Sequence, residues 1–150
     1  MSGNLVRKII GVGAGTAVAA TLAVTVSSTP ASAAPVWCGN WLSEPSLASN
    51  ISPVPGTTAN VGGPTYIRVN QGTYGGKWYA WAKMYNYGMD LVSLIWVNQS
   101  DKAIYACGSR DGEQEWSQDY TAGVDDAHAY KVQAKYKHSA VAYGPTVIWR

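Results

Sequence analysis

The sequence predicts a small all-β protein, built as an antiparallel β-sandwich or a partly closed barrel of about six or seven strands. Beyond residue 64, short apolar or alternating segments are separated by polar turns. No segment outside the N-terminal leader shows helical periodicity of useful length. One segment, AYKVQAKYK at 129–137, alternates strictly between two faces, which is typical of a strand with one buried side.

The first 33 residues have the layout of a secretory signal peptide. Arg7 and Lys8 form a basic start, small apolar residues run from 9 to about 26, and 31–33 is an Ala-Ser-Ala cleavage pattern. Retention as a membrane anchor is the alternative, because the apolar run approaches the length of a short membrane span, but three glycines within it weaken that interpretation. We expect a helical signal peptide that is removed, and a secreted, extracellular chain without membrane attachment that begins near Ala34.

The charge of the mature chain argues against nucleic acid as a partner. The whole sequence has 11 basic and 9 acidic residues, and the leader contains two of the bases and none of the acids. The expected mature chain therefore has a formal charge of zero, and the pI of about 8.5 derives from the leader. A chain of about 117 residues suits one domain, and we expect a monomer.

Cys38 and Cys107 are the two cysteines of the sequence. An even pair in an exported chain predicts a disulfide. The bond would close a loop of about 70 residues and stabilise the fold by about 4 kcal/mol, because it restricts the unfolded chain. A reactive thiol or a metal site is the alternative, but the paired spacing of zinc sites is missing, and we expect no metal and no cofactor.

Residues 34–64 contain many Pro and Ser residues and predict an extended, turn-rich arm with one short strand, packed on the β domain of residues 65–150. The expected strands of that domain are TYIRVN (65–70), KWYAWAKMYNY (77–87), LVSLIWV (91–97), AIYACGS (103–109), EQEWSQDY (113–120), AYKVQAKYK (129–137) and PTVIW (145–149). The continuous apolar run at 91–97 is typical of a central strand covered on both faces. The Asp-Gly pair at 111–112 predicts a tight hairpin.

The aromatic composition is unusual, with 7 Trp, 10 Tyr and no Phe. Trp and Tyr combine apolar area with a polar tip and therefore suit partly solvent-exposed positions, including binding faces. In the segment 77–87, alternation places an apolar set on one face, which suits a core: Trp78, Ala80, Ala82 and Met84. The other face carries four aromatic residues and two lysines: Lys77, Tyr79, Trp81, Lys83, Tyr85 and Tyr87.

The second face of that strand has two interpretations. In the first, its aromatic rings pack under the Pro-rich arm and its lysines lie at the rim. In the second, the rings stay partly open as a stacking row for sugar rings or for a partner's surface, and the lysines supply hydrogen bonds. The second interpretation makes the six residues of this face the candidate binding site.

Catalytic and metal-binding patterns are weak. The two histidines, His128 and His138, lie ten positions apart on one expected strand and cannot easily share a site. The Asp-Asp-x-His run at 125–128 could hold a cation, but a solvated turn is expected there. Glu113 and Glu115 lie at roughly the separation of a glycosidase pair, but their face is polar, so nothing would keep one of them protonated. We therefore predict no catalytic residue.

The pattern L-x-x-L-x-W followed by Y-A-C-G within 91–108, together with a Tyr-rich alternating strand before Trp149, resembles small secreted proteins that are common in actinobacteria. The resemblance implies a bacterial host and transfers no active site. The function expected from the sequence is a secreted, non-catalytic binding module for carbohydrate or cell-envelope polymer, acting through the aromatic face. The alternatives are a protein-binding inhibitor of an extracellular hydrolase, working through the loop 109–113, and, third, a small hydrolase.

Overall fold

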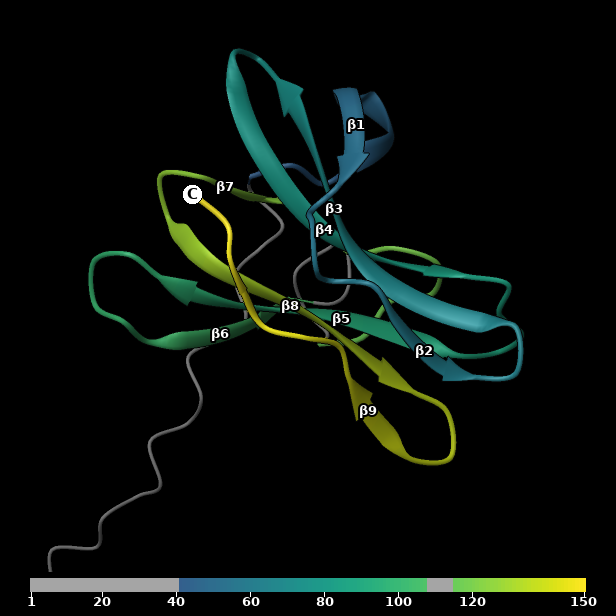
Figure 1. Cartoon of the computed structure of the whole chain (residues 1–150). Helices are drawn as coiled ribbons and strands as arrows, with labels where there is room; N and C mark the ends of the chain where they lie inside the picture. Colours follow the sequence, from purple (N-terminus) through teal and green to yellow (C-terminus); the bar gives the residue numbers. More distant parts are fainter. Residues whose placement is uncertain (1–40, 108–114) are drawn as a thin grey trace, which may run out of the picture. The chain divides into compact units, whose positions relative to one another are not determined.

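The computed structural model describes residues 41–107 and 115–150, and these residues form ten strands and one short 3-10 helix, with no α-helix among them. The predicted all-β class is confirmed. The elements are η1 (Pro45–Leu47), β1 (Ser49–Pro53), β2 (Ala59–Gly62), β3 (Thr65–Tyr74), β4 (Lys77–Tyr85), β5 (Leu91–Asn98), β6 (Ile104–Cys107), β7 (Val124–Asp125), β8 (Ala129–Lys137), β9 (Val141–Tyr143) and β10 (Val147–Ile148). Figure 1 shows them coloured along the chain.

The strands form two antiparallel sheets, and neither closes into a barrel. The first sheet has the order β1, β3, β4, β7, and β2 pairs with the start of β3. The second has the order β10, β8, β5, β6, and β9 pairs with β8. Strands β3 and β4 pack against β5 and β8, as Figure 1 shows, so the arrangement is that of a β-sandwich.

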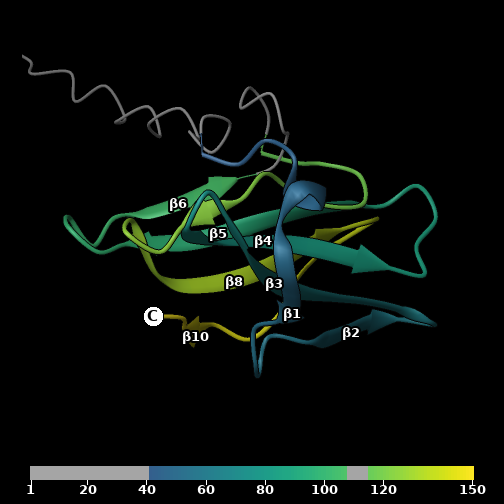
Figure 2. The ribbon, with the colours of Figure 1, turned by 90° about the horizontal axis from the view of Figure 1, so that it is seen from above.

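The segment 34–64 is more than an extended arm in its described part. It contributes β1 and β2, which both pair with β3 along the same edge of the first sheet. Figure 2 shows β1 beside β3. Most side chains of these two strands are exposed or half-buried, so they lack the apolar alternation by which a strand is recognised in a sequence.

The core lies between the two sheets. It contains the predicted apolar set of β4, the inward residues Val92, Leu94 and Trp96 of β5, and Val132, Ala134 and Tyr136 of β8. On β8 the intervening residues 131, 133 and 135 are half-buried, so the predicted alternation is confirmed over 131–137. At the start of the strand it is wrong, because Ala129 is buried and Tyr130 is half-buried beside an irregularity in the pairing with β5. On the outer face of β5, Ser93 is fully buried, whereas residues 91, 95 and 97 are half-buried, so the expected coverage of this face is only partial.

Two expected strands are shorter or absent. Only 147–148 of the segment 145–149 is paired, as β10. Residues 115–120 form no strand and make single bridges instead, and the expected hairpin at 111–112 lies outside the described residues. The strand expected at 113–120 was therefore predicted wrongly in its described part, 115–120.

Residues 117–121 instead join the two sheets. Ser117 exchanges backbone hydrogen bonds with Val92 of β5, at 2.8 and 2.9 Å. Two residues further on, the N–H of Met84 in β4 donates to the carbonyl of Asp119 at 2.8 Å. Asp119 has a positive φ of 64°, which turns the chain from one sheet to the other. This crossing segment closes one side of the sandwich and brings Tyr120 to the outer face of β4.

Cys107 lies buried at the end of β6, where its sulfur accepts a 2.9 Å hydrogen bond from the indole N–H of Trp96. Cys38 and the leader lie outside the described residues, so the disulfide and the signal peptide remain predictions. Within 41–107 and 115–150, no helix is long and apolar enough to cross a membrane.

Candidate binding site

The aromatic residues in the first half of β4 are covered. Tyr79 and Trp81 expose only 7% and 3% of their surface. They form a second apolar cluster with Leu42, on the side of the first sheet that faces away from the main core. The partly buried residues around this cluster are Trp41, Ala48 and Tyr120. The beginning of the described chain covers this half of the strand, as the packing interpretation predicts. Neither ring therefore offers an open face for stacking, and Trp81 contributes only its small exposed part to the pocket described below.

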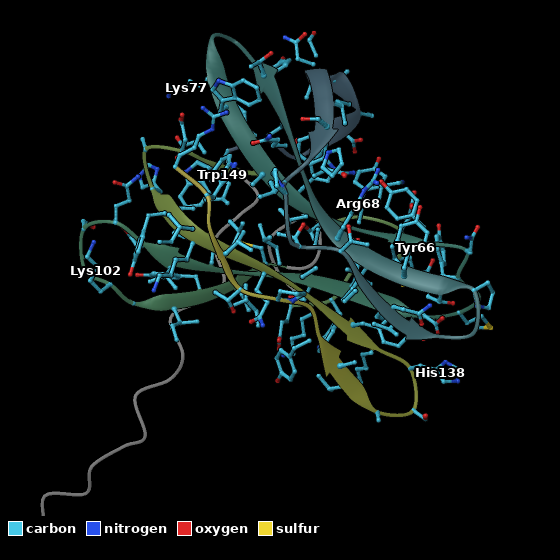
Figure 3. All side chains as sticks on the ribbon, viewed as in Figure 1. Tyr66, Arg68, Lys77, Lys102, His138 and Trp149 are labelled. Carbon is cyan, nitrogen blue, oxygen red and sulfur yellow. The ribbon has the colours of Figure 1, made fainter. Side chains whose placement is uncertain are left out.

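The second half of the same face is more accessible. Lys83 and Tyr85 are half-buried, and Tyr87, just beyond β4, is exposed. Lys77 is exposed at the opposite end of the strand, about 26 Å from Tyr85 along an extended chain. Figure 3 shows Lys77 far from Arg68 and Tyr66 on the β3–β4 hairpin. The six predicted residues therefore do not form one continuous open row along the strand.

A pocket of about 210 Å³ opens on this accessible half, where η1 and β1 face β3 and β4. Four elements (η1, β1, β3 and β4) and the crossing segment contribute side chains. The lining residues are Pro45, Ser46, Ile51, Arg68, Asn70, Trp81, Lys83, Tyr85 and Tyr120. The pocket thus combines three aromatic residues with two cations and an amide, and it contains three of the residues predicted from the sequence.

Arg68 and Tyr85 form the polar centre of the pocket. Arg68 donates from Nη2 to the Tyr85 hydroxyl at 2.7 Å and from Nε to Oδ1 of Asn70 at 2.8 Å. Asn70 in turn donates from Nδ2 to the Tyr85 hydroxyl at 2.9 Å. The Tyr85 ring also stacks on Tyr66, with centroids 4.6 Å apart. Stacking and hydrogen bonding together restrict the rotamers of these side chains.

Lys83 is neutralised within the site. Its Nζ lies 2.8 Å from Oδ1 of Asp119 on the crossing segment, and also 5.4 and 5.2 Å from the ring centroids of Tyr85 and Tyr120. Burial, followed by the charge of Asp119 and a hydrogen bond to it, raises the pKa of Tyr87 above its usual value. The carboxylate of Asp119 is therefore shared between a lysine and a tyrosine at the rim of the pocket.

The other side of the pocket is tied to the N-terminal part of the chain. Tyr120 donates from its hydroxyl to Oε2 of Glu44 at 3.1 Å. Glu44 directly precedes η1, whose Pro45 is buried and lines the pocket. This link holds η1 near the face of β4, so the pocket depends on residues about 75 positions apart in the sequence.

Sequence reasoning missed Arg68, Asn70 and Tyr120. Arg68 and Asn70 occupy the polar positions of TYIRVN, and in the sheet they lie opposite Lys83 and Trp81. Pairing the two predicted strands as a hairpin would have brought Arg68 to the candidate face. Nothing in the sequence pattern indicates that Tyr120 joins them, because its position depends on the crossing segment.

The remaining candidate groups lie elsewhere, and the two histidines have separate partners. His128 Nδ1 lies 2.5 Å from Oδ1 of Asp125, and its ring stacks on Trp41 at 4.7 Å. His138 bonds to the buried carboxylate of Asp90. The described residues contain no group of three or more His, Cys, Asp or Glu side chains suited to a metal ion.

The proposed carboxylate pair and the proposed inhibitor loop lie largely outside the described residues. Glu113 and the loop 109–113 belong to the segment that is not described. Glu115 is described, and it forms an ion pair with Lys135 on β8.

Comparisons of the chain with protein-family models, with curated proteins and with solved structures found no match.

Proposed function

We propose that the protein is an exported, non-catalytic binding module that holds one sugar unit of a polysaccharide in the pocket between η1, β1 and the β3–β4 face. The observation that supports it best is the composition of the lining. Aromatic side chains and hydrogen-bonding groups of Arg68, Asn70 and Ser46 converge on one small concave surface. Ligand sites typically combine apolar walls with a few well-placed polar groups in this way.

The size of the pocket favours a small ring over an extended ligand. Its volume of about 210 Å³ is below the range of roughly 300–1,000 Å³ that is usual for drug-sized molecules. A sugar ring has an apolar face that suits an aromatic wall and hydroxyls that suit the polar groups at its edge. The remainder of a polymer would extend over the exposed Tyr87 and Ile51 at the rim.

Export is part of the same proposal. The leader at 1–33 and the expected Cys38–Cys107 disulfide support it, since both are typical of chains that leave the cytoplasm. A polysaccharide of the cell envelope or its surroundings would then be within reach of the protein.

A pull-down of the purified exported protein with insoluble or immobilised polysaccharides tests the proposal. Tyr85→Ala removes one wall of the pocket and should reduce the retained fraction about tenfold or more, given the typical cost of losing an aromatic contact and its hydrogen bonds. Tyr143→Ala is the matched control, because Tyr143 is exposed on β9 of the other sheet.

Two results would contradict this function. One is equal retention of the wild type and Tyr85→Ala, which would place the binding elsewhere. The other is no retention on any glycan by a protein that circular dichroism shows to be folded. Inhibition of a secreted hydrolase by that same protein would favour the protein-binding alternative.

A further inference from the structure

We infer that the sugar held in this pocket carries a carboxylate, and that Arg68 is the residue that recognises it. The inference rests on the proposed function, because it names the chemical class of the ligand at the same site. It follows from three features of the pocket: the unused donors of Arg68, the balance of charge, and the hydroxyl hydrogen of Tyr85.

Arg68 has hydrogen-bonding capacity to spare. A guanidinium carries five N–H donors in a planar fork. Two of them donate to Asn70 and to the Tyr85 hydroxyl, and no other acceptor within 41–107 and 115–150 takes the rest. The donors that remain belong to a side chain that lines the pocket and is half-buried. They are available to a ligand.

The charge of the pocket is not balanced by the described protein groups. No acidic side chain is among its lining residues. The positive charge of Lys83 is matched by Asp119 at 2.8 Å, whereas none of the described carboxylates lies within ion-pair distance of Arg68. A half-buried cation without a counter-charge is unfavourable, so an anion bound beside Arg68 would supply the charge that the described part of the chain does not.

Tyr85 offers a further donor. A phenol hydroxyl can accept two hydrogen bonds and donate one. Both acceptor positions are taken by Arg68 and Asn70, so the hydroxyl hydrogen is directed toward another acceptor, and no described residue supplies it. Arg68 and Tyr85 thus present donors side by side, and the 4.5 Å contact between the guanidinium and the Tyr85 ring holds them in that arrangement.

The single unmatched positive charge favours a singly charged ligand group. A phosphate monoester carries about 1.5 to 2 negative charges at neutral pH and would leave the pocket with an excess of negative charge. A carboxylate carries one charge and has two oxygens in the plane that suits the guanidinium fork. A sugar acid in which the carboxylate is part of the unit therefore fits both the charge and the size of the pocket.

Binding of the exported protein to matched polymers tests this inference. The acidic panel is polygalacturonate, alginate and hyaluronan. The comparison panel is their methyl esters, neutral dextran and a sulfated dextran. We expect at least one acidic polymer to bind about tenfold or more tightly than its methyl ester, because esterification removes the charge and leaves the sugar in place.

Substitutions of Arg68 test whether this residue recognises the carboxylate. Arg68→Gln should lose about tenfold or more of the affinity for the acidic polymer, and Arg68→Lys should recover only part of it, because a lysine keeps the charge and lacks the fork. Lys77→Gln removes the same charge from the exposed far end of β4 and should bind like the wild type. Thermal unfolding of each variant checks that the fold is kept, and the methyl-ester comparison depends on no variant.

Several outcomes would overturn the inference. Equal binding to the acidic polymers and their esters, or binding to neutral polymers alone, would reject it and leave the proposed function standing. Equal binding of sulfated dextran and the carboxylate polymers would reject the carboxylate assignment. Equal losses in Arg68→Gln and Lys77→Gln would show that overall charge, and not the pocket, attracts the ligand. Failure to bind any glycan would reject the proposed function together with the inference.

Discussion

The guanidinium carbon of Arg68 lies 4.5 Å from the centroid of the Tyr85 ring, while its Nη2 donates a 2.7 Å hydrogen bond to the hydroxyl of the same tyrosine. Arg68 is on β3 and Tyr85 on β4, and the residue opposite Arg68 is Lys83. The contact is thus diagonal across the two strands, a distance that long side chains can span. It holds a cation and a phenol in a fixed arrangement on one side of a pocket.

Replacing Tyr85 by Phe tests this arrangement. The variant keeps the ring but removes the oxygen that accepts from Arg68 and Asn70. We expect a loss of about 1–3 kcal/mol in the free energy of unfolding, because two donors in a half-buried region lose their acceptor, and weaker ligand binding. Urea denaturation measures the first effect. Tyr66→Phe is the control, since the Tyr66 ring stacks on Tyr85 and its hydroxyl bonds to no described residue. Equal losses in both variants would contradict a specific role for the Tyr85 hydroxyl.

The link between the two sheets gives a second prediction, at the fully buried Thr121. Its Oγ1 accepts a 3.1 Å hydrogen bond from the N–H of Ala82 in β4. Thr121→Val keeps the shape of the side chain and leaves that N–H unpaired, so we expect a loss of about 1–3 kcal/mol in the free energy of unfolding. Thr146→Val is the control at an exposed position. An unchanged free energy of unfolding in Thr121→Val would contradict the prediction, because it would mean that the lost hydrogen bond does not destabilise the fold.

The carboxylate of Asp90 should make stability depend on pH in the acid range. Burial alone would raise the pKa of Asp90, but hydrogen bonds from His138 and Tyr136 outweigh it and hold the pKa below its usual value. Its contribution to stability is therefore complete above the usual pKa of 3.8, and it is lost as the pH falls through the lower value of the folded state.

Asp90→Asn should accordingly be less stable than the wild type at neutral pH, and the difference between them should shrink below about pH 4. Urea unfolding curves at several pH values measure this difference. Asp126→Asn is the control, because no described side chain donates a hydrogen bond to the Asp126 carboxylate. A difference that stays constant down to the acid limit of folding would contradict the prediction.

The disulfide predicted from the sequence can be tested directly. The intact mass of the exported protein should be lower by two hydrogens than that of the reduced chain. Cys38→Ser should lower the free energy of unfolding by about 4 kcal/mol, because the unfolded chain regains the freedom of a loop of about 70 residues. A reductant should lower the stability of the wild type toward that of the variant and leave the variant unchanged. Two free thiols in the exported protein would disprove the bond.

Local pattern was sufficient for several elements of the fold. The alternation of 129–137 predicted β8 with its observed bounds and, from residue 131 on, its buried face, and the apolar half of KWYAWAKMYNY predicted the inner face of β4. These predictions succeed because the period of a strand is two residues, and burial of one face leaves that period in the sequence. By contrast, β7, β9 and β10 have only two or three residues each. Their pairing depends on the longer strand beside them, so no local period marks them.

The sequence by itself determined the all-β class, the two faces of β4 and the aromatic character of the candidate site. Only the tertiary structure decided which part of that face is covered. The residues around Leu42 bury Tyr79 and Trp81 and leave Tyr85 at a pocket, while β3 places Arg68 beside it. Alternation says which side of a strand a residue faces, but burial is set by segments tens of residues away, and their contacts leave no period in the chain.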